Sequence, residues 1–325
     1  MIAMIRSVTR LAFAAIAITM GLSATPSRAQ NFIVQYLSAG GSTTNACTAT
    51  QPCSSFSNAF NGIFSESDFG RIVCLTPINA TSSNDSSIGP SAADTIFEID
   101  CPAGIYLQPF SWASNTANST ATFRNVTFTS SDSGSVFGFS NINFRSSGTL
   151  IFENCIFENS TSISLDIEPN GPLNIVIRNS RIANNASGIL FKPAAGGSIN
   201  ATLDHVTIAN NGGGGLHTDS SNGPIAVDIT DSTISENAGN GFNVSSASSG
   251  QNNMVSITRS TIAKNGGAGI QSGGGNAAVL LDATLLDSNA SGATTVVNNG
   301  RILSYGTNRI IGTAGSGFTG TASLK

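Results

Sequence analysis

The sequence predicts an all-β fold, a parallel β-helix with coils of about 24–28 residues and a short N-terminal capping helix. Three observations lead to this prediction. An Ile-x-x-Asn tetrad recurs along the second half of the chain, and apolar residues alternate with polar ones in the segment before each tetrad. Charged residues make up only 10% of the chain, against about a quarter in an average globular protein, which favours stacked strands.

Residues 1–29 have the pattern of a signal peptide. Arg6 and Arg10 precede an apolar run at 11–22, and small residues lead to a cleavage site after Ala29. The run is shorter than the about 20 residues of a bilayer span, so a retained membrane anchor is the weaker alternative. No later stretch approaches that length. The sequence predicts export to the periplasm, the cell surface or the medium, without a membrane span in the mature chain.

The mature chain is predicted to be acidic. The formal net charge of the full chain is −4, and removal of residues 1–29 leaves 11 basic and 18 acidic residues, a net charge of −7. Binding to a phosphate backbone needs a clustered basic surface, so nucleic acid is not an expected partner. Glycine-rich segments such as NNGGGGL lack the Lys-Ser/Thr ending of a phosphate loop, and no cofactor is expected.

Four cysteines near the N-terminus predict two disulfides, as is usual in an exported protein. The favoured pairs are Cys47–Cys53, across a local turn, and Cys74–Cys101, between two neighbouring strands; the two other pairings stay open. A zinc site is the weaker alternative because there is neither a CxxC motif nor a nearby histidine, and no metal is predicted. Cys155 is expected to be a free thiol between strands.

An N-terminal cap is predicted over residues 30–101, because an open coil would expose its apolar core and unpaired strand edges. The segment PCSSFSNAFNGIF predicts a short amphipathic helix in this cap. Its apolar residues at helical spacing are Phe56, Phe60 and either Ile63 or Phe64, after Ser54 or Ser55 as N-cap.

The coils themselves are predicted over residues 102–312, followed by a flexible tail at 313–325. The tetrads place one asparagine in each coil, at successive intervals of 26, 26, 28 and 24 residues. These ladder residues are Asn185, Asn211, Asn237, Asn265 and Asn289. Because coils stack about 4.8 Å apart, the isoleucines should form a dry column and the asparagines a hydrogen-bonded ladder. A glycine after each asparagine is expected to supply the positive φ of the turn.

Leucine-rich repeats are the competing interpretation of this period. The segment LDHVTIANN at 203–211 fits their pattern. In the other coils, however, the middle position is serine or threonine, and no helical spacing follows the asparagine. The β-helix is therefore preferred.

The motifs together resemble exported bacterial right-handed parallel β-helix proteins of the pectin-lyase-like superfold, most of them uncharacterised. The resemblance lies in the C-x5-C-x2-F entry, the Cys74 and Cys101 strands, the Ile-x-x-Asn coils and the closing SYGTN. It covers nearly the whole mature chain and implies a right-handed helix but no catalytic residues. The superfold includes polysaccharide lyases, glycoside hydrolases, tailspikes and adhesins, so the fold alone does not select an activity.

A first outward patch offers candidate catalytic residues after the glycine bends: Lys192, His217 and Asp219. Cleavage of a glycosidic bond by general acid and base usually needs two carboxylates, and only Asp219 is available on that face. A solvated ion pair between Lys192 and Asp219 is the preferred interpretation.

A second outward patch follows the strands upstream of the tetrads: Arg178, Asp204/His205, Asp231 and Arg259, with Asp228 close by. Three aspartates could supply oxygen ligands to calcium, and Arg178 or Arg259 could act as the base of a lyase. Ordinary cross-rung ion pairs, Arg178–Asp204 and Asp231–Arg259, are the preferred interpretation.

The expected function is that of a non-catalytic extracellular surface protein, with an extracellular polysaccharide as the expected partner. The alternatives are a polysaccharide lyase or glycoside hydrolase acting on acidic glycans, and an adhesin or tailspike-like assembly. The sequence specifies neither the glycan nor the oligomeric state.

Overall fold

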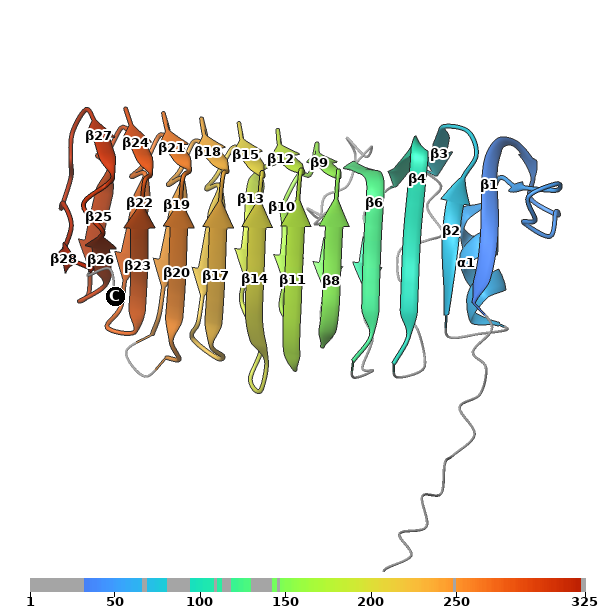
Figure 1. The fold of residues 1–325 in the computed structure, drawn as a ribbon, viewed down its shortest axis with the longest axis horizontal. Coiled ribbons are helices and arrows are strands. Elements are labelled where there is room, and N and C mark those ends of the chain that lie inside the picture. The colour runs from blue at the N-terminus through green and yellow to red at the C-terminus, as the bar shows by residue number, and fades with distance from the viewer. Residues whose placement is uncertain are drawn as a thin grey trace, which may run out of the picture. The chain divides into compact units, whose positions relative to one another are not determined.

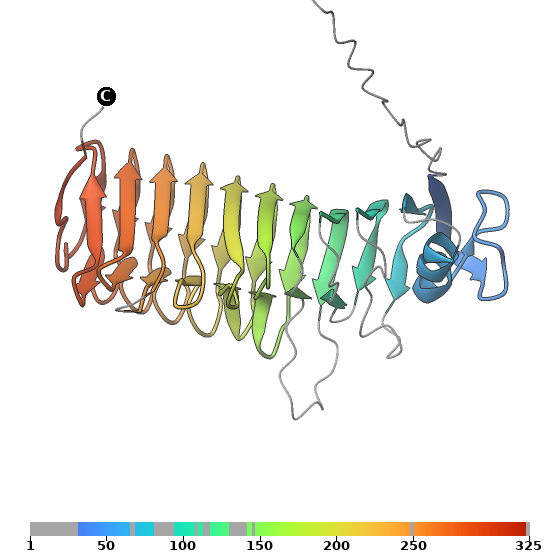
Figure 2. The same ribbon diagram turned by 90° about the horizontal axis from the view of Figure 1, so that it is seen from below.

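The chain winds into coils of β-strands that stack along one axis, as Figures 1 and 2 show for a computed structural model. The structure describes residues 32–65, 69–80, 94–107, 110–112, 118–129, 142–144, 147–247 and 250–322. The predicted signal peptide lies outside these residues. Every strand pairing between neighbouring coils is parallel, so the predicted all-β parallel β-helix is confirmed.

Two sheets run along the stack, one of 20 strands and one of eight. In the larger sheet a long and a short strand of each coil follow one another. The long strands are β8 (Gly148–Glu153), β11 (Pro172–Arg178), β14 (Ser198–Asp204), β17 (Ile225–Thr230), β20 (Asn253–Thr258), β23 (Ala277–Asp282) and β26 (Arg301–Ser304). The short strands are β9 (Ile156–Glu158), β12 (Arg181–Ala183), β15 (Thr207–Ala209), β18 (Thr233–Ser235), β21 (Thr261–Ala263), β24 (Leu285–Asp287) and β27 (Arg309–Ile311).

Among the described residues the eight-stranded sheet receives one strand from each of eight coils, and from β13 onward this strand follows the turn that carries the ladder asparagine. Its strands are β5 (Phe110–Trp112), β7 (Ile142–Phe144), β10 (Ile163–Ile167), β13 (Ser187–Phe191), β16 (Leu216–Asp219), β19 (Phe242–Ser245), β22 (Ile270–Gly273) and β25 (Thr294–Val297). Residues alternate between the interior and the outer face of the solenoid, so each outward position forms a straight row along the axis.

The N-terminal end contains the predicted helix, α1 (Phe56–Phe64). Ser55 is its N-cap and accepts a hydrogen bond from the backbone N–H of Asn58, and Phe56, Phe60 and Ile63 are buried. Among the described residues no helix is long and apolar enough to cross a membrane. The helix packs against β1 (Ile33–Ser42) and β2 (Phe69–Cys74), so the stack starts before residue 102. The next strands of the larger sheet are β3 (Ile78–Ala80), β4 (Ile96–Leu107) and β6 (Thr120–Thr129).

Two disulfides lie in this N-terminal region. Cys47 pairs with Cys53, and Cys74 on β2 pairs with Cys101 on β4, the pairing that the sequence favours. Cys155 is a buried free thiol. Burial raises the pKa of this thiol to about 12, so it has no thiolate character at neutral pH.

The asparagine ladder is formed by buried side chains between the larger and the smaller sheet. Each Nδ2 donates to Oδ1 of the next coil: Asn185 to Asn211 (3.1 Å), Asn211 to Asn237 (2.8 Å), Asn237 to Asn265 (3.0 Å) and Asn265 to Asn289 (2.9 Å). Each accepting Oδ1 also takes the backbone N–H of the preceding ladder residue. The ladder therefore satisfies buried backbone donors at a turn where the strands stop.

The positive φ of this turn belongs to the residue before each ladder asparagine. Its values are 59° at Asn184, 55° at Asn210, 57° at Glu236, 53° at Lys264 and 50° at Ser288. The expectation that the following glycine supplies it is wrong for the turns at Asn185, Asn211, Asn237 and Asn265, whereas after Asn289 Gly292 also has a positive φ, of 99°. The backbone turns one residue earlier, and asparagine is the non-glycine residue that tolerates this conformation best.

Glycine is required for a different reason, immediately before the strands of the smaller sheet. A Cβ on Gly241 would lie 2.6 Å from Nδ2 of Asn265 and 2.8 Å from the carbonyl oxygen of Gly269. Gly188, Gly215 and Gly269 occupy the same column and face the same conflict. At these four positions the next coil approaches too closely for any side chain.

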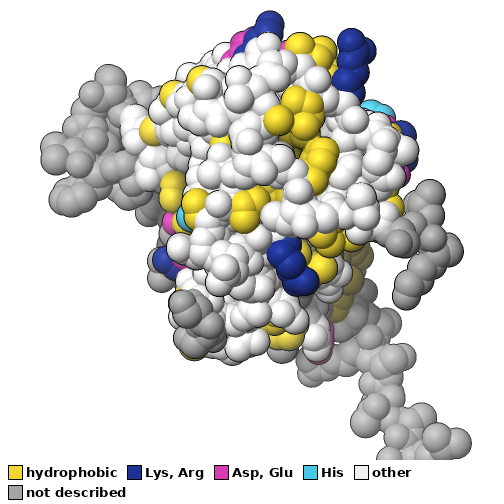
Figure 3. All heavy atoms as spheres, turned by 90° about the vertical axis from the view of Figure 1, so that its left-hand side faces the viewer, with side chains coloured by type: hydrophobic (Ala, Val, Ile, Leu, Met, Phe, Trp, Pro, Cys, Tyr) yellow, Lys and Arg dark blue, Asp and Glu magenta, His cyan; other side chains and the backbone are white. Residues whose placement is uncertain are grey.

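The C-terminal end is closed by residues 313–322, for which the sequence predicts a flexible tail. They form β28 (Gly320–Thr321), which pairs with β26, and Gly315 bridges to Thr294. Ile310 and Phe318 pack against the core but stay half-buried, and Figure 3, which faces this end, shows hydrophobic side chains among polar ones. The fold-back satisfies strand edges that a free tail would leave open.

Candidate functional site

The structure brings three candidate catalytic residues together on the outer face of the eight-stranded sheet. His217 and Asp219 lie on β16, and Lys192 follows β13 in the neighbouring coil. Their side chains point outward because the alternating residues Leu216 and Thr218 are buried inside the solenoid.

Asp219 is held as an ionised partner of Lys192. Its Oδ2 lies 3.4 Å from Nζ of Lys192, and its Oδ1 accepts the backbone N–H of Ser221 at 3.0 Å and the Ser221 hydroxyl. Burial raises the pKa of Asp219, but the Ser221 hydrogen bonds and the Lys192 ammonium together outweigh it and lower the pKa. The predicted ion pair is confirmed, and this carboxylate is a poor proton donor at neutral pH.

His217 is a neutral ring with a defined tautomer. Burial lowers its pKa, Asp219 opposes this shift, and Lys192 adds to it. Nε2 lies 3.1 Å from Oγ of Ser245, and that hydroxyl donates its proton to the carbonyl oxygen of Thr218, also at 3.1 Å. We assign the Ser245 proton to the Thr218 carbonyl oxygen, which can only accept. In this assignment Nε2 donates to Ser245, Nδ1 is the remaining acceptor of the ring, and the histidine does not activate Ser245.

A depression of about 210 Å³ opens beside His217, and sequence reasoning did not identify it. Its lining residues are Ser187, Gly214, Leu216, His217, Asn240 and Asn243. Gly214 and Asn240 are equivalent, since their carbonyl oxygens accept the backbone N–H of Gly188 and of Gly215, respectively. The Asn240 side chain fills this position in its own coil by bonding to Gln271 and to the backbone of Ala268. The missing side chain at Gly214 leaves the space open.

The outward row that contains His217 continues as uncharged polar residues. In register, the next three rungs carry Asn243, Gln271 and Thr295. Oδ1 of Asn243 is shielded from solvent and accepts no hydrogen bond from any described residue. The depression thus combines two vacant acceptors, Nδ1 of His217 and the Asn243 amide oxygen.

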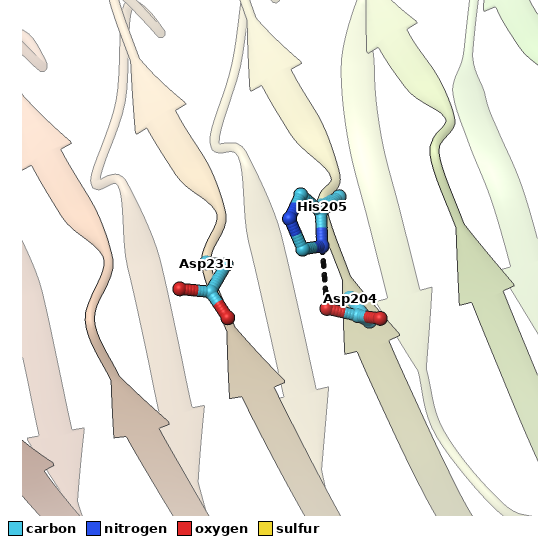
Figure 4. A group of neighbouring side chains, drawn as sticks. All are labelled: Asp204, His205 and Asp231. Atoms are coloured by element: carbon cyan, nitrogen blue, oxygen red, sulfur yellow. Dashed lines mark hydrogen bonds and ion pairs between the residues drawn. The ribbon is translucent and has the colours of Figure 1, made fainter.

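A second group of side chains lies at the turn between the long and short strands (Figure 4). Asp204 ends β14, His205 follows it, and Asp231 follows β17 in the next coil; one ligand atom from each lies within 4.8 Å of the others. Nδ1 of His205 lies 2.7 Å from Oδ1 of Asp204, which also accepts the Thr230 hydroxyl at 3.1 Å. The side chain of His205 is 60% exposed, so the group lies on an open surface.

Arg259 binds the Asp231 carboxylate with two parallel hydrogen bonds. Nε lies 2.9 Å from Oδ1 and one terminal nitrogen 2.7 Å from Oδ2, so the predicted Asp231–Arg259 pair is confirmed. The hydrogen bonds from Arg259 lower the pKa of Asp231, and those to Asp231 raise the pKa of Arg259. Arg259 is therefore poorly suited to be the base of a lyase, which must lose a proton.

The other predicted pair of this patch is wrong. Arg178 lies opposite Asp204 in the strand register, but these two described residues form no ion pair. Asp204 turns instead to its neighbour His205 and to Thr230. Asp228, the third expected calcium ligand, lies in another outward row and is not part of the group in Figure 4.

Asp204, His205 and Asp231 offer the oxygen and nitrogen atoms that divalent cations bind. A cation held by all three would have to replace Arg259 on Asp231 and compete for the carboxylate that His205 contacts. No metal is predicted there from the sequence, although both aspartates are considered as possible calcium ligands. Two carboxylates and one imidazole make a weak ligand set for calcium, which prefers six to eight oxygens.

Comparison with known proteins identifies the repeat. The family model described as a right handed beta helix region matches residues 104–307. No curated protein matches the sequence significantly. Among solved structures, the crystal structure of pectate lyase Pel9A aligns with a TM-score of 0.48 and 13% sequence identity, over 91% of this chain and 80% of that chain.

Proposed function

Because this chain belongs to the right-handed β-helix family, we propose that it is an exported protein that binds an extracellular polysaccharide without cleaving it. The observation that carries the proposal is the outer face of the eight-stranded sheet. There, the uncharged row from His217 to Thr295 advances one coil at a time, and its first two members, His217 and Asn243, line a depression with vacant hydrogen-bond acceptors. A glycan chain presents hydroxyl groups at regular intervals and can follow such a row.

The chemistry of both outward patches supports binding without catalysis. Glycoside hydrolysis needs a carboxylic acid that keeps its proton near neutral pH, and such groups have raised pKa values. The pKa shifts of Asp219 and Asp231 both go downward. A lyase needs a base, and the Arg259 guanidinium is stabilised in its charged form. His217 is neutral, but none of the described acids or bases is hydrogen-bonded to it.

The disulfides support the exported location. Cys47–Cys53 and Cys74–Cys101 are structural bonds of a kind that persists in oxidising compartments and is rare in the cytosol. The apolar segment at 11–22 supplies the corresponding export signal in the sequence.

The experiment combines binding and cleavage on the same purified mature protein, residues 30–325. Affinity gel electrophoresis measures retardation by soluble polysaccharides, and long incubations are followed by reducing ends and by the absorbance of unsaturated products. We expect retardation by at least one glycan and no products. Products that disappear in the His217→Gln or Asp204→Asn variant would overturn the non-catalytic function.

A second candidate is metal-assisted cleavage of an acidic glycan at Asp204, His205 and Asp231, favoured by the approach of their ligand atoms to within 4.8 Å. Calcium would then bridge the glycan carboxylate and the aspartates. This candidate predicts that product formation from polygalacturonate appears on addition of calcium, stops with a chelator, and is absent in Asp231→Asn.

A further inference from the structure

We propose that the depression beside Gly214 binds one sugar ring of a neutral glycan, and that it rejects rings carrying a carboxylate. This inference rests on the proposed function and names the class of glycan and its place. The lining residues are those already given: Ser187, Gly214, Leu216, His217, Asn240 and Asn243.

The vacant polar atoms of the depression are acceptors. In the tautomer assigned above, Nε2 of His217 donates to Ser245 and Nδ1 accepts, and Oδ1 of Asn243 has no donor among the described residues. A buried acceptor without a donor costs stability, so a turn of the shielded Asn243 amide towards a ligand hydroxyl is favoured. A sugar hydroxyl donates a hydrogen bond, whereas an ionised carboxylate only accepts. The ligand that satisfies both vacant atoms is therefore rich in hydroxyl groups.

The charges around the depression also favour a neutral sugar over an anionic one. Lys192 is the cation that acts on His217, and it is already bound to Asp219 at 3.4 Å. An anionic sugar would have to break this pair to gain a counter-charge. The full chain also carries a formal net charge of −4, which repels a polyanion at low ionic strength. A neutral ring meets neither penalty.

Gly214 creates the space for the ring. Its carbonyl oxygen stands in one column with that of Asn240, whose side chain bonds to Gln271 and fills the same position one coil further. Gly214 has no positive φ, and a Cβ there would come no closer than 3.3 Å to the Asn240 carbonyl oxygen. A side chain at position 214 is thus compatible with the fold and would occupy the depression.

One substitution at position 214 tests whether the depression binds the sugar, and a second substitution in the same glycine run serves as its matched control. Gly214→Asn copies the residue of the next coil and fills the depression. Gly212→Ala changes the same glycine run outside it, and a Cβ at Gly212 would lie 3.4 Å from its nearest neighbour, an ordinary contact. Asn243→Ala removes the vacant amide and serves as a second probe if Gly214→Asn does not fold.

The test is affinity gel electrophoresis of the mature wild type and the three variants. The neutral glycans are galactomannan, arabinoxylan and mixed-linkage β-glucan, and the anionic glycans are polygalacturonate and alginate. We expect retardation by a neutral glycan, a loss of affinity of about tenfold or more in Gly214→Asn and Asn243→Ala, and no change in Gly212→Ala.

The other outcomes separate the two proposals. Retardation only by the anionic glycans contradicts the neutral specificity and leaves polysaccharide binding intact. Retardation by a neutral glycan that is equal in wild type, Gly214→Asn and Asn243→Ala places the binding site elsewhere and overturns this inference alone. Retardation by none of the five overturns the proposed function and this inference with it.

Discussion

Replacement of Asn237 by alanine tests whether the buried ladder holds the coils together. The side chain makes four hydrogen bonds. Its Nδ2 donates to Oδ1 of Asn265 at 3.0 Å and to the carbonyl oxygen of Ile208 at 3.2 Å, and its Oδ1 accepts the side-chain and backbone N–H groups of Asn211 at 2.8 and 3.2 Å. Asn237 is only 1% exposed, so water does not replace these partners.

The expected loss follows from the groups that remain. The backbone N–H of Asn211 loses its acceptor inside the protein, which costs about 1–3 kcal/mol. Each of the other bonds contributes about 0.5–1.5 kcal/mol, and these values are not fully additive because the bonds share atoms. We therefore expect Asn237→Ala to lower the free energy of unfolding by about 3 kcal/mol.

The assay is urea denaturation followed by circular dichroism, with Asn200→Ala as the matched control. Asn200 is exposed on the outer face of β14, and its replacement should change the free energy of unfolding by less than about 0.5 kcal/mol. If Asn237→Ala were as stable as Asn200→Ala, the ladder would not be a source of stability and the account of this turn would fail.

Three further results are expected. Gly241→Ala should destabilise the protein by about 1–3 kcal/mol in the same assay, because its Cβ would lie 2.6 Å from Nδ2 of Asn265, whereas Gly212→Ala should not. As the pH falls below 6.5, His217 takes up a proton in the unfolded state but not in the folded state, where its pKa is lowered. Wild type should then lose more stability between pH 7 and pH 5 than His217→Gln; an equal loss would contradict the assigned burial. Cys155 should react with a thiol reagent only after unfolding, and rapid labelling of native protein would contradict its burial.

The repeating part of the fold could be predicted because each of its rules acts within one coil. The Ile-x-x-Asn tetrad identifies both the apolar column and the ladder, since stacking puts equal positions in contact. Helical spacing and a serine N-cap were sufficient for α1 in the same way. Only the position of the positive φ was assigned to the wrong residue. In the sequence, either a glycine after the asparagine or the residue before the asparagine could take the positive φ of the turn. Which of them takes it depends on how closely the backbone of the next coil approaches.

The contacts on the outward face were less predictable, because an outward side chain can form a hydrogen bond or ion pair with any of several neighbours. Arg178 and Asp204 are opposite in register, yet the carboxylate bonds to His205, which is adjacent in the chain. The depression was missed for a related reason. Its signal was present in the sequence as Gly214 at a position where the next coil has Asn240, but the equivalence is evident only when the backbone hydrogen bonds are known.

The chain contains two histidines, one in each outward patch, and they allow the central claim to be tested in one measurement. Histidine-selective NMR of the mature protein, assigned with His205→Gln and His217→Gln, follows both rings during titration with galactomannan oligosaccharides and the other neutral probes. Binding at the depression predicts that the ring signals of His217 shift in a saturable way while those of His205 stay in place. A saturable shift of His205 alone, or of neither ring while the glycan binds, would contradict the account.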